Sequence, residues 1–202
     1  MNNEYIISGG CLFWFSKRIF DIVFSISLIP ILIILTIFLF LFNRFYNKGP
    51  IFFIQKRMGK NCKPFFAVKF RSMIVADNID RKHNDPVEIE RVTPLGKIIR
   101  RIRFDEIPQI INVIKGDMSL IGPRPDYFEH AKVYVKTIQG YEGRHIIRPG
   151  ISGLSQIRLG YAEGMRATKA KANVDKFYIE NAGFLLDTKI LFGTIFIIFR
   201  IY

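Results

Sequence analysis

Apolar residues are distributed unevenly along the chain, and the longest apolar run lies near the N-terminus. Residues 19–42 read IFDIVFSISLIPILIILTIFLFLF and carry a single charge, Asp21. About 20 helical residues cover the roughly 30 Å hydrocarbon core of a bilayer, so this run is long enough to cross one. Pro30 interrupts it near the middle, where a missing N–H and a ring clash kink or break a helix. The run predicts either a straight helix that tolerates proline or a helix-break-helix anchor that re-enters the same face.

Basic residues flank this run on both sides. They are Lys17 and Arg18 before it, and Arg44, Lys48, Lys56 and Arg57 after it. Lys and Arg accumulate on the cytoplasmic side of membrane segments, so both flanks have cytoplasmic character. A segment that enters, bends at Pro30 and returns satisfies both flanks. We expect residues 1–46 to form an N-terminal membrane-anchor segment and residues 47–202 to form a globular domain.

After residue 47 the pattern changes to short apolar runs typical of strands. PIFFIQKR (50–57) and PFFAVKFRSM (64–73) are rich in aromatic and β-branched residues, and MGKNCK separates them. This arrangement predicts a β-hairpin. Six basic residues and no acidic residue lie from Lys56 to Arg71. Such a run is usually a solvated face, but a neighbouring anchor favours a surface that faces anions.

The remaining apolar pattern is mostly helical. Residues 78–92 are polar and predict a loop, whereas residues 95–102 predict a short helix that is apolar on one side and basic on the other. Residues 162–180 have helical composition, and residues 190–202 are apolar but too short to span a membrane. We expect that last segment to lie at the membrane interface or to pack on the domain. The predicted fold is mainly helical α+β, with a re-entrant anchor before a small cytoplasmic domain that contains a hairpin and amphipathic interfacial helices.

One helix follows directly after a pair of acids, Asp105 and Glu106. Its apolar positions follow helical spacing: Ile107, Ile110, Ile111 and Ile114. Asp105 is a suitable N-cap, and Gly116 is a suitable end. Acids at a helix N-terminus are favoured by capping and by the helix dipole, and a purely structural role is the more common explanation for such a pair.

The composition restricts the classes of function. The 202 residues include 30 Lys or Arg against 17 Asp or Glu, a net charge of +13, and half of all residues are hydrophobic. An anionic membrane surface or a phosphate-rich ligand fits both properties. Nucleic acid is disfavoured as a partner because no zinc-finger, RNA-binding or basic-region motif is present. Cys11 and Cys62 lack metal-ligand spacing, which indicates two reduced thiols.

Several arginines stand in stiff segments near the acidic pair. Four basic residues lie within residues 97–103, GPRP places Arg124 between two prolines, and RPGISGLSQIRLG carries Arg148 and Arg158. Fixed backbone angles keep guanidinium groups aimed for two-point contact with phosphate. This concentration of cations favours a phosphate site over a simple helix cap for the acidic pair.

Taken together, six stretches of the sequence resemble, in order, the signatures of the bacterial sugar transferases. These are the monotopic phosphoglycosyl transferases that start cell-surface glycan assembly. The stretches are KRIFDIVFS, GPIFFIQKRMG, FFAVKFRSM, TPLGKIIRRIRFDEIPQIINVIKGDMSLIGPRP, RPGISGLSQ and DKFYIENAGFLLDTKIL. The likeness extends from about Phe15 to the C-terminus, and its most specific part is the block from the acidic pair to GPRP.

The resemblance implies an enzyme that transfers a sugar-1-phosphate from a nucleoside-diphosphate sugar, typically a UDP-sugar, to polyprenol (undecaprenyl) phosphate. The nucleoside monophosphate is released, and the resemblance implies that residues 47–202 form the catalytic sugar-phosphate transferase domain. Members of the family are anchored by a re-entrant helix on the cytoplasmic face of the inner membrane, which favours the bent form of residues 19–42. The implied partners are the nucleotide sugar, the polyprenol phosphate and membrane lipid, with a second copy of the chain as a further candidate. With about 15 residues ahead of the anchor, the chain looks like the minimal form of the family.

The resemblance also implies site residues. The catalytic Asp-Glu pair of the family falls on Asp105 and Glu106. Its substrate-binding basic residues fall on Lys69, Arg100, Arg124 and Arg148, and more weakly on Arg158. Three positions depart from the family pattern: Ile29 replaces the Ser of a Ser-Pro bend, Arg103 replaces a Ser or Thr, and QIRLG replaces a Q-V-N-G-R form. The sugar is therefore not predicted.

In the hypothesis that follows, Asp105 is a nucleophile and the cations allow it to approach a diphosphate. Each pair of unit charges 4 Å apart repels by about 4 kcal/mol at an effective dielectric constant of 20. Mg²⁺ held by Asp105 and Glu106 would offset this repulsion. One alternative is a membrane-tethered basic protein that binds anionic lipid or polymer without chemistry. Another is direct transfer in a ternary complex, with Asp105 only as a metal ligand.

Overall fold

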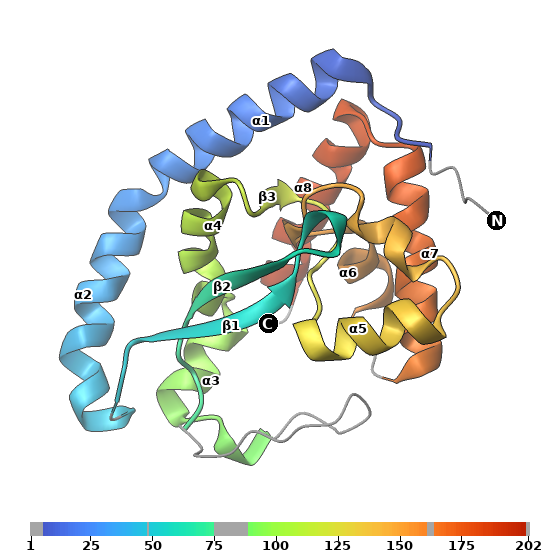
Figure 1. Ribbon diagram of the computed structural model, residues 1–202. Helices are drawn as coiled ribbons and strands as arrows, with labels where there is room; N and C mark the ends of the chain where they lie inside the picture. Colours follow the sequence, from blue (N-terminus) through green and yellow to red (C-terminus); the bar gives the residue numbers. More distant parts are fainter. Residues whose placement is uncertain (1–5, 48, 75–88, 161–163, 201–202) are drawn as a thin grey trace.

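The computed structural model describes residues 6–47, 49–74, 89–160 and 164–200 (Figure 1). The α-helices are α1 Gly10–Ser27, α2 Ile29–Tyr46, α3 Pro94–Arg101, α4 Ile110–Lys115, α5 Phe128–Thr137, α6 Leu154–Leu159, α7 Met165–Glu180 and α8 Phe184–Arg200. The strands are β1 Phe52–Met58, β2 Pro64–Phe70, β3 Ser119–Ile121 and β4 Gly150–Ser152. Short 3-10 helices are η1 Lys60–Cys62, η2 Ile89–Arg91, η3 Phe104–Gln109 and η4 Tyr141–His145. The mainly helical α+β class with a hairpin is confirmed.

Helices α1 and α2 form a bent arm along one side of the molecule (Figure 1). The break falls at Leu28, and Pro30 lies in the first turn of α2, where its missing N–H removes no bond within the helix. The hydroxyl of Ser27 donates to the carbonyl of Phe24 (2.8 Å) next to the break. The predicted interruption near Pro30 is confirmed, and both helices extend beyond residues 19–42.

No single helix in the described ranges is both long and apolar enough to cross a membrane. The helices Gly10–Ser27 and Ile29–Asn43 meet the length and composition requirement only as a pair, bent by 41°.

One stripe of α1 is polar and packs on the rest of the protein. Lys17, Asp21 and Ser25 follow each other at four-residue spacing and are all buried. The ammonium of Lys17 lies 2.6 Å from the carboxylate of Asp187 on α8, and Asp21 accepts a hydrogen bond from the backbone N–H of Leu120 (3.1 Å). Exposed apolar side chains cover the outer surface of α1: Leu12, Phe15, Ile19, Phe20, Val23, Phe24 and Ile26. Helix α1 thus turns this polar stripe inward and many of its apolar side chains outward.

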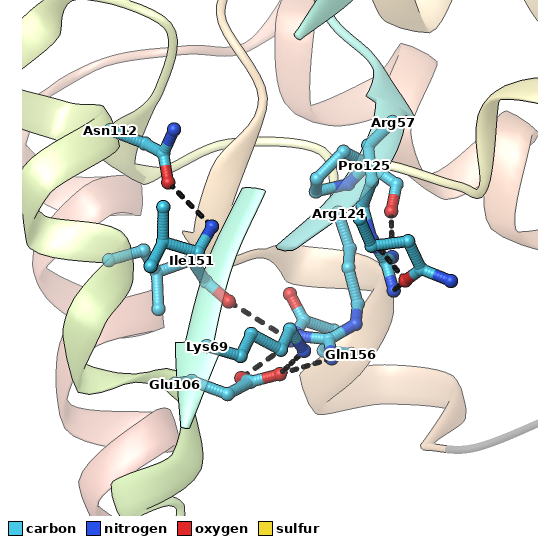
Figure 2. A network of polar contacts seen from close by, with 10 residues as sticks. Arg57, Lys69, Glu106, Asn112, Arg124, Pro125, Ile151 and Gln156 are labelled. Atoms are coloured by element: carbon cyan, nitrogen blue, oxygen red, sulfur yellow. Dashed lines mark hydrogen bonds and ion pairs between the residues drawn. The ribbon is translucent and has the colours of Figure 1, made fainter. Parts of the chain in front are cut away.

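The predicted hairpin is confirmed. Strands β1 and β2 are antiparallel, in a register that runs from Phe52 opposite Phe70 to Met58 opposite Pro64. The other edge of β2 is covered by one buried side chain of α4, Asn112. Its Oδ1 accepts from the N–H of Val68 (3.0 Å), which is the dashed line drawn from Asn112 in Figure 2. Its Nδ2 donates to the carbonyl of Phe66 (2.7 Å). This amide satisfies the strand edge as a neighbouring strand would.

A short parallel pair, β3 and β4, lies behind the hairpin. Ser119 pairs with Gly150 and Ile121 with Ser152. The strands approach so closely after β3 that a Cβ on Gly150 would lie 2.1 Å from the backbone nitrogen of Gly122. A core cluster joins this pair to the C-terminal helices: Ile121, Ile147, Leu154, Tyr178, Ile179 and Ile190. The closeness of the two backbones fixes the start of the loop that carries Arg124.

The predicted helix start at Asp105 is wrong. Arg103 takes a left-handed backbone conformation (φ 60°), η3 follows over residues 104–109, and α4 begins only at Ile110. The side chain of Asp105 therefore lies within a 3-10 turn and caps no helix. Gly116 ends α4 as expected, with φ 95°. Of the predicted stripe, Ile110 is buried, whereas Ile114 is 37% exposed.

The other predicted elements are present with shifted ends. The helix expected over residues 95–102 is α3, and that expected over 162–180 is α7, which starts at Met165. The final apolar segment belongs to α8, which begins before residue 190. Most of the predicted loop 78–92 lies outside the described residues. Both cysteines are free.

Candidate active site

The acidic pair lies on η3, between the end of α3 and the start of α4, and η3 packs against β2. Asp105 and Glu106 are both buried, with 9% and 6% of their surface exposed. Buried carboxylates require compensation from nearby charges or hydrogen bonds. Within the described part of the chain, the carboxylate of Glu106 receives ion pairs and hydrogen bonds, whereas that of Asp105 does not.

Glu106 is held by two cations. The ammonium of Lys69, from β2, lies 2.6 Å from Oε1. Arg124 donates to both oxygens, from Nη1 to Oε2 (3.1 Å) and from Nη2 to Oε1 (Figure 2). This is the two-point guanidinium–carboxylate geometry, which adds directionality to the charge pair. Burial acts to raise the pKa of Glu106, but Arg124 and Lys69 outweigh it and hold that pKa well below its ordinary value.

Asp105 lacks such support. No side chain or backbone N–H in the described ranges donates a hydrogen bond to its carboxylate. Burial raises the pKa of Asp105, and the negative charge of Glu106 raises it further, against the opposing effect of Lys69, Arg100 and Arg124. The carboxylate of Asp105 is therefore the less stabilised of the two, and its oxygens remain available to a ligand.

The same surroundings shift the pKa of Lys69. Burial lowers its pKa from 10.5 to about 8, even though Glu106 acts to raise it. The positive charges of Arg124 and Arg57 contribute to the lowering. Lys69 is thus mostly protonated at neutral pH and titrates just above it.

The structure brings together three of the five predicted basic residues. Lys69 and Arg124 contact Glu106, and Arg100 on α3 is near enough to lower the pKa of Asp105. Arg148 is exposed and donates from Nε to the carbonyl of Gly116 (2.9 Å), at the end of α4 remote from η3. Arg158 is exposed, and its guanidinium lies 5.3 Å from the ring centre of Phe177 on α7. Substrate binding by Arg148 and Arg158 stays a prediction.

The sequence analysis did not predict several residues whose hydrogen bonds hold the site-bearing segments in place. Asn112 joins β2 to α4, and Arg57 on β1 donates to the carbonyl of Pro125 in the loop that presents Arg124 (Figure 2). Gln156 on α6 donates to the carbonyl of Ile151 on β4 (3.3 Å). These contacts join segments that are far apart in the chain, and local spacing gives no signal for them.

The donor set permits a divalent cation with few protein ligands. No cluster of three or more His, Cys, Asp or Glu side chains suited to a metal occurs in the described ranges. Mg²⁺ is commonly bound by one or two carboxylates together with phosphate oxygens of the substrate. Asp105, with both oxygens unengaged by donors, fits this mode. Both oxygens of Glu106 already accept from cations, so Glu106 could share an ion only beside Arg124 and Lys69.

Comparison with known proteins finds a matching family model and several relatives. The family model described as "Bacterial sugar transferase" matches residues 12–201. The chain is 40% identical over 184 residues to UDP-N-acetylgalactosamine-undecaprenyl-phosphate N-acetylgalactosaminephosphotransferase of Aeromonas hydrophila, covering 91% of this chain and 44% of that protein. It is 38% identical to UDP-glucose:undecaprenyl-phosphate glucose-1-phosphate transferase of Klebsiella pneumoniae, covering 89% and 39%. Exopolysaccharide production protein PSS of Rhizobium leguminosarum bv. phaseoli is 37% identical, with 89% and 92% covered. The chain thus spans less than half of the first two relatives.

Proposed function

The chain belongs to the bacterial sugar transferase family, and from this premise we propose that it is a phosphoglycosyl transferase. It moves a sugar-1-phosphate from a UDP-sugar to undecaprenyl phosphate and releases UMP. The names of the relatives from Aeromonas hydrophila and Klebsiella pneumoniae, which state a UDP-sugar and undecaprenyl phosphate, support this substrate class. The product would begin a surface glycan.

The proposed chemistry has two steps, and Asp105 acts in both. First, a carboxylate oxygen of Asp105 attacks the sugar-linked phosphorus, and the bond from that phosphorus to the bridging oxygen breaks. UMP leaves with the bridging oxygen, and an aspartyl phosphosugar remains. Second, a phosphate oxygen of undecaprenyl phosphate attacks the same phosphorus, which breaks the acyl phosphate bond and restores the carboxylate. Two steps allow a water-soluble donor and a lipid acceptor to use one site in turn.

The difference between the two acids is the observation that carries this assignment. A nucleophile needs oxygens that are not engaged by donors, and Asp105 meets this condition while Glu106 does not. Glu106 instead holds Lys69 and Arg124 in place, where their remaining N–H groups can contact donor phosphates. Mg²⁺, bound by Asp105 with Glu106 and the donor phosphates, would neutralise charge on the diphosphate. Arg100 adds positive charge on the α3 side.

We further propose that the arm of α1 and α2 is a re-entrant anchor on the cytoplasmic face of the inner membrane. Its outward apolar surface and its bend at Leu28 support this placement. The exposed apolar side chains of α8, which include Leu185 and Phe192, fit an interfacial position. The lipid acceptor would then reach the site from the adjoining leaflet.

The test is to trap the covalent intermediate. The protein is incubated with a UDP-sugar and Mg²⁺ but no acceptor, quenched with acid and digested, and the peptides are analysed by mass spectrometry. We expect the added phosphosugar on Asp105, one UMP per active site, and neither in Asp105→Asn. Glu129→Gln, which removes an exposed acid of α5, is the matched control and should retain both signals.

Three results would contradict parts of the proposal. Glycolipid formation without a trapped intermediate, accompanied by sequential rather than ping-pong kinetics, would indicate direct transfer in a ternary complex. Absence of UMP release from every UDP-sugar, with binding to anionic vesicles that is indifferent to Mg²⁺, would indicate a tethered binding protein. Retained turnover in Asp105→Asn would remove the nucleophile role from this residue. UDP-glucose and UDP-N-acetylgalactosamine are the first donors to compare.

A further inference from the structure

The loop that presents Arg124 has an unusual backbone environment. Four consecutive carbonyls, from Pro123 to Asp126, each accept a hydrogen bond from a residue distant in the sequence. The donors are Gly150 N for Pro123 (2.9 Å), Arg144 Nη2 for Arg124 (2.8 Å), Arg57 Nη1 for Pro125, and Met58 N for Asp126 (3.1 Å). The two prolines also fix their own φ angles. Little backbone freedom is left where the guanidinium of Arg124 must be aimed.

Arg144, on η4, is the buried charged donor among these, with 2% of its side chain exposed. Besides the carbonyl of Arg124, it pairs with the carboxylate of Asp126 through Nη1 and lies 2.7 Å from a carboxylate oxygen of Asp175 on α7. Tyr141 also donates its hydroxyl to Asp126. A fully buried arginine is costly unless it is paired, and here two acids pair it while it holds the loop.

We propose that Arg144 is a positioning residue for the transfer reaction, which acts on the substrate only through Arg124. It connects α7 and η4 to the backbone of the loop. The guanidinium of Arg124 is thereby kept hydrogen-bonded to the carboxylate of Glu106 and faces the donor phosphates. A lysine cannot reproduce this role, because a single ammonium cannot serve the Arg124 carbonyl, Asp126 and Asp175 with fixed geometry. This inference rests on the proposed function, since it concerns donor phosphates at that site.

The test compares Arg144→Lys, Arg124→Ala and the double variant, in full-length protein. Arg144→Lys keeps the buried charge and so avoids leaving two acids unpaired. We expect it to lower kcat/KM by about 10- to 100-fold, the order of loss caused by a misplaced catalytic group. In the Arg124→Ala background the same change should lower kcat/KM by less than about 2-fold, because coupled residues are not additive. Equal losses in both backgrounds would overturn the proposal.

A second measurement does not depend on activity. Hydrogen exchange of peptides covering residues 120–128 should accelerate in Arg144→Lys. It should not accelerate in Thr93→Val, which loses the hydrogen bond that the buried Thr93 hydroxyl accepts from the N–H of Gly96 (3.0 Å) at the start of α3. Unchanged exchange in Arg144→Lys would overturn the positioning role even in an active enzyme. Wild-type protein that releases no UMP would instead refute the proposed function, and the exchange result would still decide whether Arg144 orders this loop.

Discussion

The two acids of the site should respond oppositely to the removal of their charge. Glu106→Gln leaves Lys69 and Arg124 facing a neutral amide in a region where their side chains are only 15% and 22% exposed. Breaking a buried pair by neutralising one partner costs about 3–5 kcal/mol. We take the lower value, about 3 kcal/mol, because Arg124 keeps partial access to water.

Asp105→Asn should be nearly neutral or stabilising for the fold. Burial and Glu106 raise the folded-state pKa of Asp105 above its unfolded value. A carboxyl group whose pKa is higher in the folded state binds its proton more tightly there. It therefore stabilises the fold at pH values below its unfolded-state pKa, and this stabilisation is lost as pH rises through the folded-state pKa. At pH 7 the ionised carboxylate therefore opposes folding relative to a neutral side chain. Removing the charge costs no hydrogen bond from the described residues, so we expect a change within about 0.5 kcal/mol or a gain.

Thermal unfolding in detergent or nanodiscs measures both changes. For a chain of this size, 1 kcal/mol corresponds to roughly 2–4 °C in Tm. Glu106→Gln should then lower Tm by roughly 6–12 °C, whereas Asp105→Asn should leave Tm unchanged or raise it. Both variants should lose UMP release. If Asp105→Asn unfolds as readily as Glu106→Gln, Asp105 is a structural acid like its neighbour, and the argument from unengaged oxygens fails.

Three further predictions concern residues around the site. Because the pKa of Lys69 is about 8, kcat/KM should fall above about pH 8, and Lys69→Arg should move this limb to higher pH; an unmoved limb would exclude Lys69 as its source. Asn112→Leu leaves two backbone groups of β2 unpaired and should cost about 2–3 kcal/mol in denaturant unfolding; a loss below about 1 kcal/mol would contradict its role at the strand edge. Lys17→Met leaves Asp187 with the Tyr178 hydroxyl as its remaining described partner and should make α1 more sensitive to protease in nanodiscs, whereas an unchanged cleavage rate would show that this ion pair does not hold α1 in place.

Local patterns along the chain were sufficient for most of the fold. The short aromatic and β-branched runs of the hairpin and the proline inside the apolar run each predicted the element that the structure contains. The prediction that Asp105 caps a helix was wrong because helix N-caps and 3-10 turns contain the same types of residue. The left-handed backbone at Arg103, which decides between them, is not favoured by any local sequence signal for a non-glycine residue.

The sequence analysis anticipated only some of the groups that surround the acidic pair. The family resemblance pointed to Lys69 and Arg124, and both contact Glu106. Asn112 and Arg144 act across long sequence separations, for example 44 residues from Asn112 to Val68. Contacts of this kind depend on tertiary packing, and no spacing rule identifies them.

The polar stripe of α1 has a consequence for how the arm can be exchanged between proteins. Successive helical residues differ by about 100° in direction. Deleting one residue between Asp21 and Leu28 would leave the contacts of Lys17 and Asp21 intact but would swing α2 around the axis of α1 by that angle. Chimeras that join this arm to the body of another transferase should therefore work only when whole turns are preserved, because the stripe fixes the direction in which α2 extends from α1.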